Sequence, residues 1–328
     1  MNTSQNDIMV EVNNLKMYFP IKRGISRRKA GDIKAVDDID FTIKKNETLG
    51  LVGESGCGKT TTGRCISRLY APTSGSIFFD GTDISRMPVK QLKPIHRSIG
   101  TIFQDAYGSL NPRQKAGNIV ADPLKLHQLA DKTEINDRVG ALFLLVGLDP
   151  EIANQTPYEL SRGQQQRIAI ARAVASQPSL VICDEPVSAL DISVQAQIIN
   201  LLEELQESLE LTYLFLSCDL SMVLYISDRV AVMYLGRILE LTTSEELCEN
   251  PLHPYTQALI SATPITDPII DKTRRRIVLE GEIPSPVNPP TGCHFHPRCP
   301  IVIGECSEQR PPLRDVGGGH YVACIRVK

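Results

Sequence analysis

The sequence lacks any apolar run that approaches the roughly 18 residues typical of a membrane-spanning helix. Its first residues also lack the basic and apolar segments of a secretory signal, so we expect the protein to be made in the cytosol and to stay there. An excess of one charge sign is missing too, because 35 basic and 38 acidic residues give a net charge of −3. Such a balance gives no strong field toward nucleic acid or acidic lipid, and we expect no nucleic-acid partner.

Internal repeats and low-complexity tracts are also absent from the 328 residues, a length that predicts about two domains. The 42% hydrophobic and 22% charged residues exclude a disordered or fibrous chain. Composition changes near residue 250, beyond which proline is frequent. Proline at this density excludes long helices and central strands. We therefore expect one domain over residues 1–250 and a small appended domain over residues 251–328.

The predicted elements are those of an α/β protein. Residues 10–19, 35–43 and 47–53 read as strands, and the basic stretch 21–31 between the first two is predicted to be a solvated loop. Residues 179–186 and 212–219 resemble buried parallel strands, with a helical pattern over residues 195–209 between them. That alternation predicts a mostly parallel sheet covered by helices.

A glycine-rich segment, GESGCGKT at residues 53–60, follows a predicted strand and precedes a predicted helix. It matches the G-x-x-x-x-G-K-[ST] pattern in the context that the pattern requires. The glycines let the backbone wind around a phosphate, the lysine reaches the β- and γ-phosphates, and the threonine hydroxyl ligates Mg²⁺. We therefore expect ATP and Mg²⁺ as cofactors, held by Gly53, Glu54, Ser55, Gly56, Cys57, Gly58, Lys59, Thr60 and Thr61.

Two carboxylates end the predicted strand at residues 179–186 and supply the other half of such a site. Asp184 is expected to hold Mg²⁺ through its shell, and Glu185 to polarise the water that attacks the γ-phosphate. A plain ion-pairing role for this dipeptide is the alternative.

Further motifs follow in order along the chain: Gln104 within residues 102–113, LSRGQQQR at 160–167, and SALD at 188–191. Together with the phosphate loop they resemble the ABC-type ATPases. The segments NPLHPYTQALISATP and GCHFHPRCP further resemble the ATP-binding subunits of oligopeptide/dipeptide importers. The resemblance implies a P-loop ABC-type nucleotide-binding domain, with a mixed sheet and a helical subdomain at about residues 105–177, followed by a small Pro/Cys-rich domain.

The resemblance also implies a dimer in which each ATP lies between one chain's phosphate loop and the other chain's signature motif. Phe19 or Tyr18 stacks on adenine, and the sequence does not choose between them. Gln104 contacts Mg²⁺ or water and senses the membrane partner. Asp191 couples the two sites. Of the signature residues, Ser161 and Gly163 face the γ-phosphate of the second chain's ATP, and Arg162 and Gln164 beside them are further candidates for nucleotide binding.

Two positions depart from the family pattern. Position 162 is arginine where the signature has glycine, and its long cation either blocks the close backbone approach to the phosphate or binds the phosphate itself. Cys218 stands where the family has a histidine that contacts the γ-phosphate. A neutral thiol is a weak donor, so hydrolysis at this chain's own phosphate loop is expected to be slow.

Nine cysteines, an odd number in a long chain, indicate thiols, metal ligands or catalysis before disulfides. Four of them, Cys293, Cys299, Cys306 and Cys324, lie in the proline-rich segment. Four thiolates can hold a [4Fe–4S] cluster or Zn²⁺, and the family resemblance favours the iron–sulfur cluster. The spacing C-x₅-C-x₆-C-x₁₇-C is neither a short zinc-finger nor a ferredoxin pattern, so reduced thiols also remain open.

The function implied by the resemblance is an ATPase subunit on the cytoplasmic membrane face that energises peptide import. Its expected partners are two integral-membrane permease subunits, an extracellular peptide-binding protein and a paired ATPase subunit, with a heterodimer favoured over a homodimer. One alternative is an ATP-binding regulatory subunit with a slow, degenerate site, because of Cys218 and Arg162. Another is a soluble ABC protein that acts on ribosomes or DNA.

Overall fold

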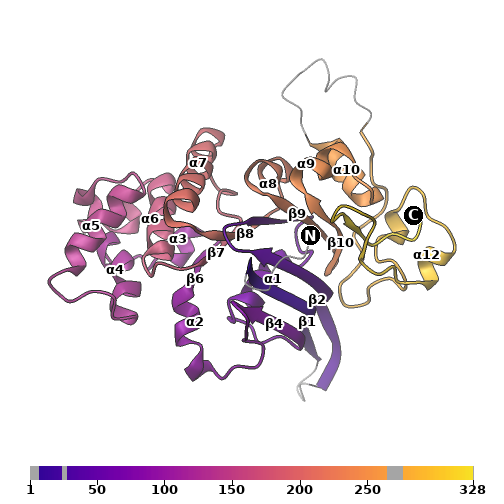
Figure 1. Ribbon diagram of the computed structural model, residues 1–328, viewed down its shortest axis with the longest axis horizontal. Coiled ribbons are helices and arrows are strands. Elements are labelled where there is room, and N and C mark those ends of the chain that lie inside the picture. The colour runs from indigo at the N-terminus through magenta and orange to yellow at the C-terminus, as the bar shows by residue number, and fades with distance from the viewer. Residues whose placement is uncertain (1–6, 24–27, 264–275, 328) are drawn as a thin grey trace. The chain divides into compact units, whose positions relative to one another are not determined.

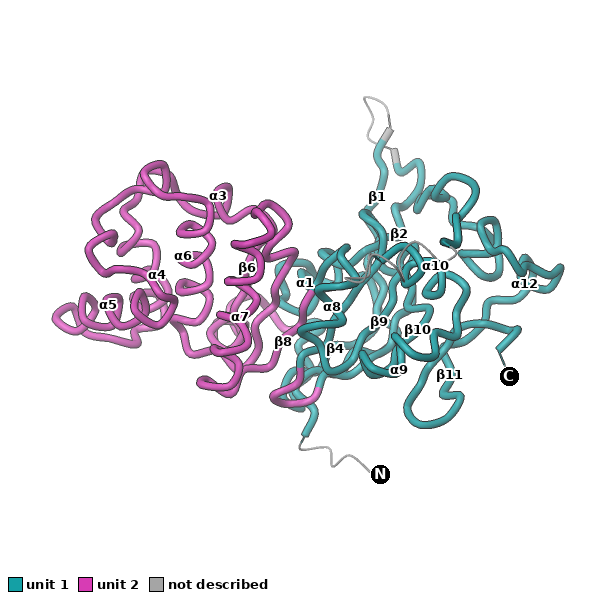
Figure 2. The backbone as a smooth tube through the Cα atoms, turned by 90° about the horizontal axis from the view of Figure 1, so that it is seen from above, with its two compact units in different colours: residues 1–43, 48–86, 216–328 teal, residues 44–47, 87–215 magenta. Residues whose placement is uncertain are grey.

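The computed structural model describes residues 7–23, 28–263 and 276–327. The chain forms two compact units, drawn in different colours in Figure 2. Unit 1 combines residues 1–43, 48–86 and 216–328, and unit 2 combines residues 44–47 and 87–215. No helix in these described ranges is long and apolar enough to span a bilayer.

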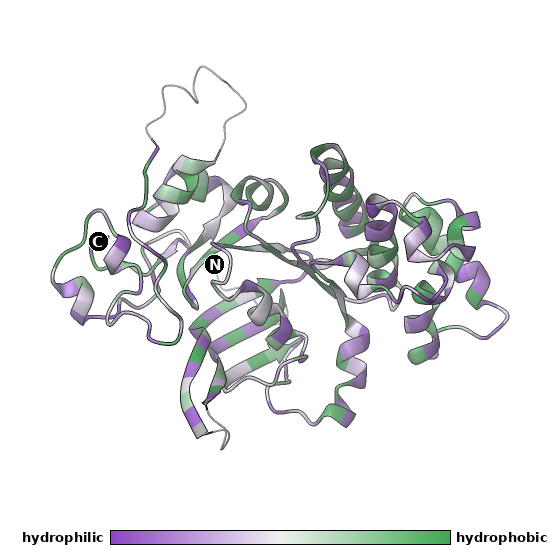
Figure 3. Cartoon of the chain, turned by 180° about the vertical axis from the view of Figure 1, so that it is seen from behind, coloured by the Kyte–Doolittle hydropathy of each residue, from purple (hydrophilic) through white to green (hydrophobic). Residues whose placement is uncertain are grey.

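A four-stranded sheet in unit 1 is built from the N-terminal part of the chain. Its order is β2 (Arg28–Lys44), β1 (Ile8–Arg23), β4 (Ser74–Phe79) and β5 (Thr82–Asp83), with β1 antiparallel to β4. Hydrophobic and hydrophilic residues alternate along these strands (Figure 3), so one face is available for the core. The expectation of a loop at residues 21–31 is wrong for its described part, since both strands continue into it; residues 24–27 lie outside the described residues.

The second set of strands in unit 1 carries the phosphate loop. β3 (Thr48–Val52) runs parallel to β9 (Arg229–Tyr234), and β9 pairs antiparallel with β10 (Arg237–Thr243). Two short strands near the C-terminus extend this sheet, because β12 (Tyr321–Val322) pairs with β10 and with β11 (Arg314–Asp315). The sheet is therefore mixed. The family resemblance implied such a mixed sheet, whereas the alternation of strands and helices alone predicted a mostly parallel one.

Helices surround these strands in unit 1 (Figure 1). Helix α1 (Lys59–Ile66) follows the phosphate loop, and α8 (Leu220–Ile226) follows the strand that ends at Ser217. After β10 come α9 (Ser244–Glu249) and α10 (Pro254–Ala262). Among the described residues that follow, 276–327, the helical elements are the 3-10 turn η5 (His296–Arg298) and the short α12 (Glu305–Glu308), consistent with the proline content of this segment.

Unit 2 combines strands with most of the longer helices. β6 (Ile99–Ile102) runs parallel to β7 (Leu180–Asp184), and β8 (Thr212–Ser217) is β7's other neighbour. Every residue of β7 and β8 is buried, as their apolar runs predict. The helices are α2 (Lys93–Ser98), α3 (Ala106–Ser109), α4 (Ala116–Leu126), α5 (Ile135–Leu145), α6 (Arg162–Val174) and α7 (Ile192–Leu209), with 3-10 turns at Val89–Gln91, Pro150–Asn154 and Pro157–Glu159.

The helix predicted at residues 195–209 lies within α7. Its buried residues Ile198, Leu201, Leu202 and Leu205 recur at intervals of three and four, the spacing of one helix face. The α/β class expected from the sequence is therefore confirmed.

Candidate nucleotide-binding site

The phosphate loop connects the fully buried strand β3 to helix α1. Gly58 has φ +117° and Gly56 has φ +80°, a left-handed backbone that glycine adopts without strain. A Cβ on Gly58 would also lie 2.3 Å from the backbone oxygen of Ala35, and one on Gly53 would lie 2.0 Å from that of Met233. Neighbouring backbone therefore leaves no room for a side chain at Gly53 or Gly58, whereas Gly56 is required for its left-handed conformation alone.

Lys59 fills the centre of this loop. The residue is only 4% exposed, and its ammonium donates to the carbonyl oxygens of Gly53 at 2.8 Å and Glu54 at 3.3 Å. Ser55 and Gly56 are exposed at the outer edge of the same loop. A cation held within a glycine-rich loop at the start of a helix is a suitable environment for a phosphate anion. Thr60 and Thr61, at the start of α1, are half-buried.

Cys57 is a structural residue of the loop. It is 4% exposed, and the Gly236 amide donates to its carbonyl oxygen at 2.8 Å. Burial raises the pKa of the Cys57 thiol, which disfavours the thiolate that oxidation and alkylation require.

The two candidates for adenine stacking lie next to each other on β1. The Phe19 ring packs edge-on against Tyr70, with ring centres 5.4 Å apart. The Tyr18 hydroxyl donates to Asp37, and burial together with this carboxylate raises the pKa of Tyr18. Both rings are half-buried, and each already contacts a neighbouring side chain.

In unit 2 the structure brings the proposed catalytic carboxylate next to a proposed sensor residue. Asp184, at the end of β7, is 4% exposed. The next residue, Glu185, has φ +47°, an uncommon conformation outside glycine that costs free energy and is frequent at functional sites. The exposed Gln104 donates through Nε2 to Glu185 Oε2 at 2.7 Å.

The signature motif forms the start of helix α6. Ser161 is the N-cap, with its hydroxyl accepting from the Gln164 amide at 3.3 Å while the Gln164 side chain accepts from the Ser161 amide at 2.9 Å. Arg162 is exposed and donates to the Ala189 carbonyl oxygen at 3.2 Å. A hollow of about 690 Å³ is lined by residues that include Ser161, Arg162, Gly163, Gln164 and Asp191. Residues thirty apart in sequence thus share one concave surface.

Cys218 directly follows β8 and is exposed. The next residue, Asp219, caps α8 by accepting from the Ser221 amide at 2.9 Å. The thiol therefore sits at a defined strand–helix junction in unit 1.

The four C-terminal cysteines lie near one another. Burial raises the pKa of the Cys293 thiol to about 11, and the charges of the other three thiols contribute in the same direction. No set of three or more Cys, His, Asp or Glu side chains within residues 7–23, 28–263 and 276–327 is arranged to hold a metal ion. The ligand chemistry suits a metal, but the thiols do not form a ready site.

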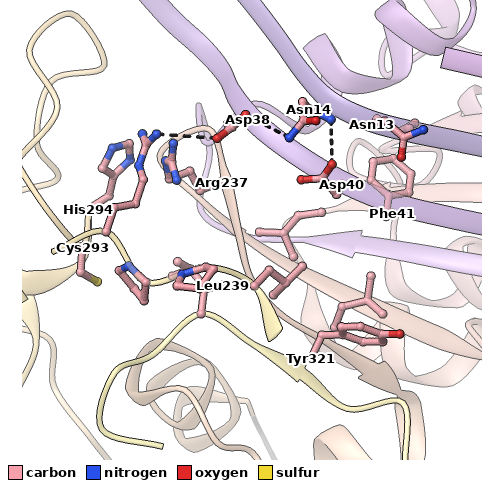
Figure 4. Close-up of a pocket in the computed structure, with 18 of the residues that line it drawn as sticks. Asn13, Asn14, Asp38, Asp40, Phe41, Arg237, Leu239, Cys293, His294 and Tyr321 are labelled. Carbon is pink, nitrogen blue, oxygen red and sulfur yellow. Dashed lines mark hydrogen bonds and ion pairs between the residues drawn. The ribbon is translucent and has the colours of Figure 1, made fainter. Parts of the chain in front are cut away.

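A cavity of about 530 Å³ also opens in unit 1, between β1, β2, β10 and the C-terminal segment (Figure 4). Asp38 in its wall accepts from the Asn14 side chain at 3.5 Å and pairs with Arg310 at 3.8 Å, while Asp40 accepts from the Asn14 amide at 2.7 Å. These charges are thus satisfied within the wall.

Sequence reasoning missed two residues that contact the phosphate loop. Arg298 forms an ion pair with Glu54 at 2.9 Å, and the Tyr255 hydroxyl accepts from the Glu54 amide at 3.1 Å. Both lie in segments that we had identified only through the family resemblance, and no local spacing connects them to residue 54.

Comparison with known proteins agrees with these features. Residues 36–188 match the ABC transporter family, and residues 239–306 match the oligopeptide/dipeptide transporter C-terminal region. Among solved structures, the ATP-binding cassette MJ0796, in a dimeric post-hydrolysis state bound to ADP and Pi, is similar with a TM-score of 0.65 and 29% identity, covering 72% of this chain and 99% of that chain.

Among curated proteins, the oligopeptide transport ATP-binding protein OppF of Escherichia coli (strain K12) is 46% identical over 328 residues, covering 99% of this chain and 98% of its own length. The oligopeptide transport ATP-binding protein AppF of Bacillus subtilis (strain 168) is 52% identical over 325 residues, which are 99% of each chain. The present chain therefore belongs to the ABC transporter family, within its group of oligopeptide transport ATP-binding proteins.

Proposed function

We propose that this chain binds and hydrolyses MgATP to energise the import of peptides through separate permease subunits. The observation that carries the proposal is the phosphate loop, in which the buried Lys59 is held by the carbonyl oxygens of Gly53 and Glu54 directly after a buried strand. The names of the 46–52% identical relatives, which are oligopeptide transport ATP-binding proteins, supply the transport role.

In the proposed reaction, Lys59 and the loop amides bind the β- and γ-phosphates, while Thr60, Asp184 and Gln104 hold Mg²⁺ directly or through water. When bound by these residues, Mg²⁺ would supply positive charge against the negative charge that develops on the transferred phosphoryl group. Glu185 polarises the attacking water, and its hydrogen bond from Gln104 orients the carboxylate. Ser161, Gly163 and Gln164 of one subunit bind the γ-phosphate held by the other, and Asp191 couples the two sites.

A heterodimer with a paired ATPase subunit is favoured by Arg162. In a homodimer, both ATP sites would meet this arginine and both would have Cys218. With a second kind of subunit that carries an intact signature, the site on this chain's phosphate loop would be completed by that signature. The assembly is proposed to lie on the cytoplasmic membrane face, with two permeases and an extracellular peptide-binding protein.

The C-terminal cysteines are proposed to hold a [4Fe–4S] cluster, with Zn²⁺ or reduced thiols as the other outcomes. Support comes from the backbone hydrogen bond of 2.8 Å that the Cys293 amide donates to the Cys306 carbonyl oxygen, and from the shortness of the elements within residues 276–327. Such a segment gains stability from a metal staple. Iron, labile sulfide and zinc analysis of anaerobically purified protein, compared with the Cys306→Ser variant, distinguishes the three outcomes.

The main proposal is tested by reconstituting the chain with its permeases and paired ATPase in vesicles. Peptide-stimulated ATP hydrolysis and peptide uptake are both expected, and Glu185→Gln should abolish the contribution of this chain's site while MgATP still binds. ATP binding without any turnover at this site would instead indicate the regulatory subunit. Peptide uptake that does not depend on ATP hydrolysis by the complex would contradict the importer role.

A further inference from the structure

The C-terminal segment contacts the phosphate loop through an ion pair that contains two hydrogen bonds. One guanidinium nitrogen of Arg298 lies 2.9 Å from Glu54 Oε2, and the other lies 3.2 Å from Oε1. Glu54 is the second residue of the phosphate loop and precedes Arg298 by 244 residues. The Arg298 side chain is 8% exposed and that of Glu54 is 26% exposed. Paired, planar hydrogen bonds between arginine and carboxylate fix geometry as well as charge.

A second contact from the same part of the chain holds the backbone of the loop. The Glu54 amide donates to the hydroxyl of Tyr255 at 3.1 Å. Tyr255 lies in α10 and is fully buried, with the rings of Tyr234 and Phe295 packed against it at 4.8 and 5.3 Å between centres. Arg298 in turn lies over the Tyr234 ring at 5.8 Å. The loop is thus anchored on a rigid aromatic cluster.

The charge of this contact matters for the ligand that the loop binds. An unpaired carboxylate in the loop would repel the triphosphate, because like charges at short range in a partly buried site are weakly screened. Arg298 neutralises that carboxylate. Burial acts against a charged guanidinium, but the hydrogen bonds to Glu54 and Tyr234 outweigh it and raise the pKa of Arg298, so the cation persists at any working pH.

The buried position of the Arg298 guanidinium costs free energy. Its Nε is buried without a hydrogen-bond partner in the described part of the chain. A buried donor that lacks a partner is unfavourable, so a surface ion pair would have been a less costly way to neutralise Glu54.

We propose that Arg298 is a positioning residue for nucleotide binding, which holds Glu54 so that the phosphate loop keeps its shape and its carboxylate is neutralised. The C-terminal segment thereby sets the affinity of the loop for MgATP. The inference rests on the ATP-binding role proposed above. Arg298 itself has no contact with the nucleotide in this scheme.

The position of Arg298 predicts which kinetic constant changes when its contact with Glu54 is removed. The loop holds the phosphates of the bound substrate and of the transition state alike, so a loosened loop weakens both equally. Such uniform loss raises KM and leaves kcat nearly unchanged. A general structural defect would lower kcat as well.

The test is calorimetric titration of the full-length chain with MgATP at several salt concentrations, followed by turnover in the assembled complex. Arg298→Ala is expected to weaken binding about tenfold, within the range typical of coupling between two regions of a protein. Arg298→Lys should recover part of this loss, since it restores the charge but not the two-point geometry. In the Arg298→Ala background, adding Glu54→Gln should tighten binding by removing the unpaired carboxylate.

Arg326→Ala is the matched control. Arg326 is an arginine of the same segment that donates to the Ile301 carbonyl oxygen at 3.3 Å, without an ion pair to the phosphate loop. Its variant should bind MgATP like the unaltered chain. Far-ultraviolet circular dichroism and thermal unfolding of every variant identify any that fail to fold, and the lysine and double variants then carry the test.

The outcomes separate this inference from the proposed function. If the unaltered chain binds no MgATP, the ATP-binding role itself is wrong. If the unaltered chain binds but Arg298→Ala changes the affinity by less than about twofold, the coupling is absent and only the inference fails. Equal weakening of MgATP binding by Arg326→Ala would also overturn the inference, because any disturbance of the C-terminal segment would then lower the affinity.

Discussion

Replacing Cys218 by histidine should accelerate ATP hydrolysis at this chain's phosphate loop. The residue follows β8, whose residues are all buried, and precedes the Asp219 cap of α8, so the backbone at this junction is fixed. The side chain itself is exposed, and a larger imidazole therefore fits without repacking a core. A protonated or neutral imidazole is a far better hydrogen-bond donor to a γ-phosphate than a neutral thiol.

The magnitude follows from the exposure of position 218. Loss of one well-placed donor to a developing negative charge costs about 10²–10³ in rate in other enzymes, where the site excludes water. An exposed position is expected to regain less, and we predict an increase of about 10- to 100-fold in kcat for Cys218→His.

The assay is MgATP turnover of the assembled complex, with the paired subunit inactivated so that only this chain's site is counted. Cys248→His, which alters another exposed cysteine on α9, is the control and should leave turnover unchanged. Equal rates for Cys218→His and the unaltered chain would refute the reasoning. Glu185 would then suffice without a donor at position 218.

Three further variants test the local structure. Ser161→Ala removes the cap of α6 and should lower the free energy of unfolding by about 1 kcal/mol in urea titrations, whereas Ser208→Ala, on the exposed side of α7, should change it little. Gly58→Ala should abolish MgATP binding, because its Cβ would lie 2.3 Å from a backbone oxygen. Gly56→Ala, whose Cβ would have no atom within 4 Å, should cost only the left-handed strain of about 1–2 kcal/mol. Similar losses of MgATP binding for both variants would contradict the packing argument. Burial lowers the pKa of His253 to about 3, whereas in the unfolded chain the value is about 6.5. The contribution of the neutral His253 side chain to stability is therefore complete above pH 6.5 and is lost as the pH falls toward 3. His253→Asn keeps a hydrogen-bond acceptor for the N-terminus of α10. The loss of unfolding free energy between pH 7 and pH 5, measured by denaturant titration at each pH, should be about 2 kcal/mol smaller in this variant, and an unchanged pH profile would refute the argument.

Local patterns predicted the elements around the nucleotide-binding residues well. The apolar runs at residues 179–186 and 212–219 became the buried strands β7 and β8, and the glycine-rich segment became a strand–loop–helix turn. These features depend on neighbours in sequence, such as left-handed glycines and buried β-branched residues, and are therefore readable from short windows.

Contacts between distant segments were not predictable in the same way. The pairing of Arg298 with Glu54 depends on how the chain returns to β3 after more than 200 residues, and nothing in either segment marks the other. The strand β12 is two residues long and pairs with β10 through backbone groups, which carry no sequence signal. For the basic stretch at 21–31, charge suggested a loop, but β1 continues to Arg23 and its sheet neighbour β2 begins at Arg28.

The discontinuous make-up of unit 1 has a consequence for the order in which the protein folds during synthesis. Unit 2 consists almost entirely of residues 87–215 and can collapse as soon as they have left the ribosome, whereas unit 1 needs residues from both ends of the chain. At about 5–20 residues per second, the 244 residues between Glu54 and Arg298 take roughly 10–50 s to make. Throughout that time the nascent chain carries a finished phosphate-loop sequence without its anchor. Unfinished or truncated chains should therefore expose the edge of β10 and depend on chaperones, and the emergence of Arg298, rather than that of the loop, should time the gain of nucleotide affinity.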